Sequence, residues 1–188
     1  MAISINQITS GIALRFDGNI FWVIESQHIK PGKGSAFAKV RIKNVKTGQT
    51  LEKTLRESDR VDDVNLDERK LQLLYQAERE VHFMDHVSFE EVAVPRSVLG
   101  DAARFLQDGI EVIAVCHGDE VLQVKLPTFI VAQITHTEPG IKGDSSRAGN
   151  KPATIDTGAT VLVPLFINPE DWIKIDTRTG QYVERVQK

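Results

Sequence analysis

The chain has 188 residues, enough for one to three small domains that each bury a core. With 41% hydrophobic and 26% charged residues its composition is that of a soluble globular protein, and no apolar run approaches the roughly 20 residues that cross a bilayer. The first residues lack the basic start and apolar core of a secretory signal, and the single cysteine, Cys116, excludes an intrachain disulfide, so we expect a cytoplasmic protein.

The net charge of −3 is unevenly spread. Residues 1–62 hold ten lysines and arginines against six acidic residues, residues 63–126 hold six against thirteen, and residues 127–188 hold seven against seven. The asymmetry predicts a first segment that faces a polyanion and a middle segment that does not. Chance variation of surface charge between domains would give the same numbers.

Turn signals divide the chain into short runs rich in β-branched and aromatic residues. Four of them read as hairpin turns: Asp17-Gly18-Asn19, Lys46-Thr47-Gly48-Gln49, Gly118-Asp119 and Thr179-Gly180. The runs recur at roughly ten-residue spacing, which is typical of small β-barrels and not of a helix-crossed parallel sheet.

One segment, residues 96–107, predicts a helix. Pro95 precedes it, Ser97 could cap its start, and Asp108-Gly109 would end it. A single helix within a strand meander suits a five-stranded OB-type barrel. Interruptions of the strand pattern near residues 62 and 127 then predict an all-β chain of three barrels, with domains at 1–62, 63–126 and 127–188.

The segment 28–36 lies between two well-defined strand patterns and presents one lysine. Pro31 stiffens its entry, while Gly32 and Gly34 permit backbone angles closed to other residues. Lys33 therefore stands at a tight tip between residues without side chains, as a slender charged arm that can enter a narrow space.

The strand after this loop extends the basic character. Alternation along residues 37–43 places Lys39, Arg41 and Lys43 on one face. Residues 28–44 contain five lysines and arginines and no acidic residue, a pattern typical of contact with a phosphate backbone. An edge strand that uses lysines against aggregation is the alternative.

The loop is not a nucleotide-binding P-loop. That motif needs serine or threonine directly after the lysine, where Gly34 stands, and a further glycine where Gln27 stands. Nucleotide hydrolysis is thus not expected.

Four blocks of the sequence each resemble a segment of the same protein family. They are residues 30–37 (KPGKGSAF), residues 137–145 (TEPGIKGDS), residues 151–167 (KPATIDTGATVLVPLFI) and residues 175–186 (IDTRTGQYVERV). In this order, along essentially the whole chain, they resemble the bacterial elongation factor P family. Two positions depart from its pattern: Ser145 stands where threonine is more usual, and Glu170 where glycine is.

The resemblance implies an N-terminal SH3-like barrel of the KOW type, followed by two OB-type barrels. It also implies a non-enzymatic monomer that binds the ribosome beside the peptidyl-tRNA in the P site and relieves stalling at consecutive prolines. Lys33 would carry a covalent modification, added by a separate enzyme, and would approach the CCA end of the tRNA. No other cofactor and no metal is implied.

Further site residues follow from these blocks. The residues expected to support the loop or to contact tRNA and ribosome are Lys30, Pro31, Gly32, Gly34, Ser35, Lys39, Arg41, Lys43, Gly143, Asp144, Ser145, Tyr182 and Arg185.

Other functions have less support. His82 and His86 have a spacing that suits a metal on a helix, but they fall on a strand pattern with no third ligand. Cys116 beside His117 lies in an apolar run, where a buried thiol is more common than a nucleophile. The main rival is a general single-stranded RNA-binding protein built on OB barrels, which would display an aromatic pair on an exposed strand face.

Overall fold

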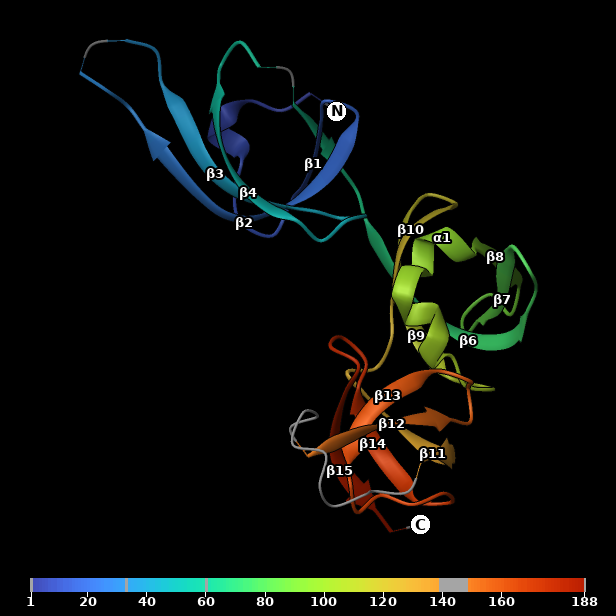
Figure 1. Cartoon of the computed structure of the whole chain (residues 1–188). Coiled ribbons are helices and arrows are strands. Elements are labelled where there is room, and N and C mark those ends of the chain that lie inside the picture. The colour runs from blue at the N-terminus through green and yellow to red at the C-terminus, as the bar shows by residue number, and fades with distance from the viewer. Residues whose placement is uncertain (1, 33, 60, 139–148, 188) are drawn as a thin grey trace. The chain divides into compact units, whose positions relative to one another are not determined.

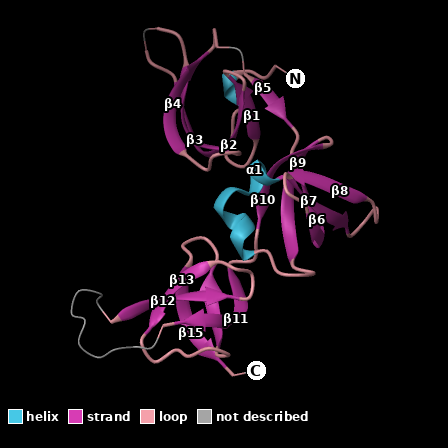
Figure 2. Ribbon diagram, turned by 45° about the vertical axis from the view of Figure 1, so that its right-hand side comes forward, coloured by secondary structure: helices cyan, strands magenta, loops and turns pink. Residues whose placement is uncertain are grey.

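The computed structural model describes residues 2–32, 34–59, 61–138 and 149–187. Within these residues it contains three five-stranded sheets, a 3-10 turn near the N-terminus and one short helical segment further along, which confirms the predicted all-β class (Figures 1 and 2). The chain forms two compact units, residues 1–69 with 114–123 and residues 70–113 with 124–188. Of the described helices, none is long and apolar enough to cross a membrane.

The first sheet is antiparallel and has the strand order β4-β3-β2-β1-β5. Its elements are the 3-10 turn η1 (Ile5–Gln7) and strands β1 (Ala13–Phe16), β2 (Asn19–Ile29), β3 (Phe37–Asn44), β4 (Thr50–Arg56) and β5 (Asp62–Val64). The predicted first hairpin is confirmed: Asp17 and Gly18 have φ of 50° and 74°, and a two-residue type I′ turn requires positive φ at both positions. Leu14, Ile42 and other buried aliphatic side chains form the core of this sheet.

The middle sheet has the order β10-β9-β6-β7-β8. Its strands are β6 (Asp67–Gln76), β7 (Glu80–Asp85), β8 (Glu91–Pro95), β9 (Glu111–His117) and β10 (Glu120–Lys125). Between β8 and β9 lie the helix α1 (Arg96–Leu99) and the 3-10 helix η2 (Gly100–Phe105).

The prediction of one continuous helix over residues 96–107 is wrong. The α-helix stops at Leu99 because Gly100 has a φ of 53°, outside the helical region, and the chain continues as a 3-10 helix to Phe105. Ser97 does not cap it either, since Pro95 occupies the N-cap position and no side chain caps the start. The apolar periodicity of residues 96–107 cannot reveal this break. Gly100 can adopt either the α-helical conformation or one with positive φ, and its presence alone does not say which.

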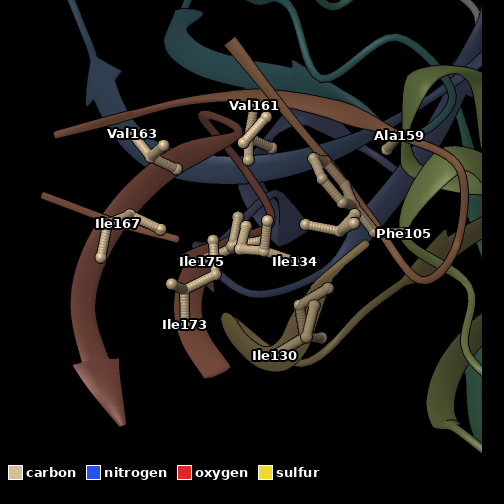
Figure 3. Close-up of a cluster of buried hydrophobic side chains, with 12 residues drawn as sticks. Phe105, Ile130, Ile134, Ala159, Val161, Val163, Ile167, Ile173 and Ile175 are labelled. Atoms are coloured by element: carbon tan, nitrogen blue, oxygen red, sulfur yellow. The ribbon is translucent and has the colours of Figure 1, made fainter. Parts of the chain in front are cut away.

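The third sheet is antiparallel with the order β13-β12-β11-β14-β15. Its strands are β11 (Phe129–Thr137), β12 (Asn150–Ile155), β13 (Thr160–Pro164), β14 (Trp172–Asp176) and β15 (Gln181–Val186). Figure 3 shows its core of aliphatic side chains, with the ring of Phe105 from η2 among them.

The predicted domain boundaries stay predictions. Residue 127 falls between β10 and β11, whereas residue 62 falls at the start of β5, which pairs with β1 in the first sheet.

Candidate functional site

The loop that carries Lys33 joins β2 and β3, while Lys33 itself lies outside the described residues. Its described neighbours Lys30, Pro31, Gly32, Gly34 and Ser35 are all exposed. Gly34 has a φ of 108°, a conformation that side chains strongly disfavour, so a glycine is needed there. The described residues on either side of Lys33 are therefore open to solvent.

Strands β2 and β3 position the loop by their length. They pair as far as Ile29 and Phe37, and β4 accompanies β3 to the same point, since Phe37 also pairs with Arg56. The loop continues from this end of the sheet (Figure 1). Near the end of β2 that leads into the loop, two side chains bond to the backbone of Ile8. The Ser26 hydroxyl donates to the Ile8 carbonyl at 2.8 Å, and His28 Nε2 donates to the same carbonyl at 3.0 Å. Because the Ile8 side chain is fully buried, these two hydrogen bonds anchor this end of β2 to the core of the first sheet.

Strand β3 has the predicted alternation. Ala38, Val40 and Ile42 are at most 2% exposed, whereas the basic residues between them face solvent. Those basic residues are Lys39, Arg41 and Lys43.

The neighbouring strands add two acidic residues to this basic strip. In register, Arg41 lies opposite Glu25 of β2 and Glu52 of β4, while Lys39 lies opposite Gln27 and Thr54. These side chains line a hollow of about 410 Å³ on the exposed face. The face is thus basic along β3 and mixed in charge across the sheet.

Sequence reasoning missed both carboxylates because they come from other strands: Glu52 faces Arg41 in the regular β3–β4 pairing, whereas the register of Glu25 depends on a bulge. Val23 pairs with Ile42 but Glu25 pairs with Arg41, so Ile24 is the extra residue of β2. Without it Glu25 would face Val40 on the opposite side of the sheet. No turn or composition signal in the sequence marks this insertion.

The hollow offers groups suited to binding an anion. Arg41 and Lys39 supply donors for a phosphate, and carboxylates beside the Arg41 guanidinium hold that side chain in a defined orientation.

Of the site residues predicted in the C-terminal part, the structure describes Tyr182 and Arg185. Gly143, Asp144 and Ser145 lie outside the described residues. Tyr182 is half-buried and packs against the core of the third sheet. Arg185 is exposed, with Nη1 at 3.8 Å from Asp171 Oδ1.

The histidine pair does not converge on a metal site. His82 Nδ1 is bonded to Glu91 Oε1 at 2.6 Å, and His86 Nε2 lies 3.7 Å from Glu111 Oε1. Within the described ranges no group of three or more His, Cys, Asp or Glu side chains could hold a metal ion. Cys116 is buried, as its apolar run predicted.

Comparison with known proteins adds a second line of evidence. Three family models match in order: the elongation factor P KOW-like domain over residues 4–61, its OB domain over residues 66–124 and its C-terminal domain over residues 130–185. A solved structure, a translation initiation factor eif-5a family protein from Naegleria fowleri, shares the fold over 67% of this chain and 98% of its own, with a TM-score of 0.51 at 16% identity. The fold and these matches define the chain as a translation factor and not an enzyme.

Full-length relatives identify the family. Elongation factor P of Natranaerobius thermophilus is 41% identical over 98% of both chains. That of Agathobacter rectalis is 43% identical over 98% of this chain and all of its own, and that of Mycobacterium avium is 44% identical over 94% and 95%. The chain belongs to the elongation factor P family.

Proposed function

We propose that this translation elongation factor binds the ribosome beside the peptidyl-tRNA in the P site, and that it stimulates peptide-bond formation at consecutive prolines. Lys33, extended by a covalent modification, contacts the CCA end of that tRNA. The observation that carries the proposal is the anchored β2–β3 hairpin, whose loop has exposed residues on both sides of Lys33 and adjoins the exposed basic face of β3.

The mechanism is positioning. Proline is a constrained secondary amine, so a nascent run of prolines leaves the reacting ester badly oriented. A factor that holds the tRNA end in place removes orientational freedom before the reaction, and such positioning contributes several kcal/mol to lowering a barrier. Lys33 acts by reach, charge and hydrogen bonding, while the ribosome supplies the catalytic site.

The basic strand and the C-terminal residues hold the factor on RNA. Lys39 and Lys43 neutralise backbone phosphates, and Arg41 binds in the orientation that Glu25 and Glu52 impose. Tyr182, Arg185 and the segment with Gly143, Asp144 and Ser145 provide contacts to the tRNA and the small subunit.

The test is translation of a Pro-Pro-Pro reporter in a system that lacks the native factor. Lys33→Ala should lower its rate at least about tenfold, which corresponds to about 1.4 kcal/mol of barrier. Synthesis of a proline-free reporter and the circular dichroism spectrum should not change. Lys30→Ala removes the same charge from the same loop and should have a much smaller effect.

Equal rates with Lys33→Ala and wild type would overturn the positioning role. Intact-mass analysis of the native protein, with peptide mapping of residues 30–39, tests the modification separately, since an unmodified lysine would contradict that part alone.

A further inference from the structure

Three side chains form a connected cluster on the solvent side of the middle sheet, on adjacent strands. The rings of Tyr75 (β6) and His82 (β7) stack with centroids 4.3 Å apart and planes 13° apart. Glu91 (β8) joins both: its Oε1 accepts the Tyr75 hydroxyl at 2.9 Å and His82 Nδ1 at 2.6 Å. We call this cluster the Tyr75 platform.

A β-bulge turns Tyr75 outward. Leu73 pairs with Phe83 but Tyr75 pairs with His82, so Leu74 is the extra residue of β6. In a regular ladder Tyr75 would face Val81, whose side chain is fully buried. Bulges commonly re-aim a side chain next to functional sites. Here the bulge leaves Tyr75 51% exposed on the surface of the barrel.

The platform is pre-organised for a ligand that stacks. His82 covers one face of the Tyr75 ring and the hydroxyl is fixed by Glu91, so the ring does not lose rotamer freedom when a ligand covers its other face. The hydrogen bond from Tyr75, and then that from His82, lowers the pKa of Glu91, while the bond to Glu91 raises the pKa of Tyr75. At neutral pH the platform therefore holds a carboxylate beside a protonated phenol.

The charge around the platform selects the ligand. Glu80 is exposed on β7, two residues before His82 and on the same side of the strand. Residues 63–126 as a whole have thirteen acidic residues against six lysines and arginines. A phosphodiester chain would be repelled here, whereas a cation would be attracted. A guanidinium is the cation that both stacks on an aromatic ring and pairs with a carboxylate.

We propose that the Tyr75 platform is a docking site for an arginine side chain on a basic protein segment. The guanidinium stacks on the open face of Tyr75 and donates to Glu91 Oε2, because both internal hydrogen bonds of this carboxylate end on Oε1. Strands β6, β7 and β8 are consecutive in the sheet order, on the part of an OB-type barrel that commonly binds ligands. This site does not depend on the function of Lys33.

The experiment is an NMR titration of the full-length protein with a blocked peptide of alternating glycine and arginine. The ring resonances of Tyr75 should shift and saturate by about 1 mM peptide, the weak end of specific binding. The matched peptide with lysine should bind at least about threefold more weakly, because lysine gains less from stacking on the ring. Oligouridine RNA should leave the resonances in place.

Variants separate binding from a merely structural role. Tyr75→Ala and Glu91→Gln should each weaken binding of the arginine peptide about fivefold or more, which is the effect of about 1 kcal/mol. Tyr75→Phe, which keeps the ring, should retain most of the affinity. Glu80→Gln removes the same charge from the same sheet but not from the platform, and should weaken binding less than Glu91→Gln.

Three results would overturn the proposal. The first is a Tyr75 ring that does not respond to the arginine peptide at about 1 mM. The second is an oligouridine that shifts the Tyr75 ring more than the peptide does, which would make the platform a base-stacking site of the rival RNA-binding kind. The third is a set of variants that lowers thermal stability yet leaves peptide affinity unchanged, since the cluster would then only brace the sheet.

Discussion

At the scale of single residues, Glu170 carries backbone strain. Its φ is 72°, in the left-handed region that side chains disfavour. Two hydrogen bonds hold it there: its N–H donates to the Ile134 carbonyl at 2.8 Å, and its carbonyl accepts from Gln133 Nε2 at 3.3 Å. The glycine expected at this position from the family pattern would adopt the same turn without strain.

Replacing Glu170 by glycine should therefore stabilise the protein. Strain relief contributes about 1–2 kcal/mol, and the more flexible unfolded chain costs about 0.4–1 kcal/mol. At the middle of both ranges the gain in unfolding free energy is about 0.8 kcal/mol. Urea denaturation followed by tryptophan fluorescence measures it. Glu170→Ala removes the charge but keeps the strain, and should gain nothing. A Glu170→Gly variant less stable than Glu170→Ala would show that the turn is unstrained, because only the cost of the more flexible unfolded chain would then remain.

Asp176 and Arg178 form a local ion pair in the turn between β14 and β15. Arg178 Nε and Nη2 donate to the two carboxylate oxygens at 3.1 and 2.7 Å. The side-chain hydrogen bond from Arg178 lowers the pKa of Asp176 from 3.8 to about 2. Since the folded pKa is the lower one, the pair stabilises the fold above pH 3.8, and its contribution is lost as the pH falls to about 2.

NMR titration of the Asp176 carboxyl should show this midpoint at about 2. In Arg178→Ala the midpoint should rise toward 3.8, and the turn should become more sensitive to acid. Arg185→Ala removes a charge from the same hairpin without touching Asp176, so it should leave the midpoint in place. A midpoint near 3.8 in the wild type would contradict the pairing.

At the scale of elements, hairpins could be predicted from the sequence and registers could not. A turn such as Asp17-Gly18 is specified by local backbone preferences, so its signal lies in adjacent residues. The extra residues Ile24 and Leu74 leave no such signal, because a bulge is decided by the packing of two strands. A shift of one residue exchanges the two faces of a strand.

These bulges explain what was missed at the candidate sites. The lysine loop and the face of β3 follow from a glycine pattern and an alternation, both local. The carboxylates beside Arg41 and the partners of Tyr75 come from other strands. The pairings of Glu25 with Arg41 and of Tyr75 with His82 each also depend on a bulge. A single-stranded RNA-binding barrel would display an aromatic pair on an exposed strand face, and the fold assembles such a pair from Tyr75 and His82 on different strands.

At the scale of the whole molecule, two hydrophobic clusters join the three stretches predicted from the sequence. In the first unit Val45 packs with Val115 and Leu122 of the β9–β10 hairpin, against Trp22. In the second unit the helical segment of the middle stretch contributes Phe105 to the core of the third sheet (Figure 3). Each of these clusters joins segments that the sequence pattern assigns to different domains.

Substitution of Phe105 measures how much its packing in the core of the third sheet contributes to the unfolding free energy of the second unit. Its side chain is 1% exposed, and Thr157 Oγ1 donates to the neighbouring Arg104 carbonyl at 2.7 Å. Phe105→Ala should remove about 3–5 kcal/mol from the unfolding free energy of the second unit. Denaturation in a Trp22→Phe background, where Trp172 is the remaining tryptophan, reports that unit alone. Phe166→Ala, at a position 61% exposed, should change stability by less than about 0.5 kcal/mol. If Phe105→Ala left the Trp172 transition unmoved, the third sheet would fold without the middle stretch, and the segment 127–188 would be the independent domain that its sequence alone predicts.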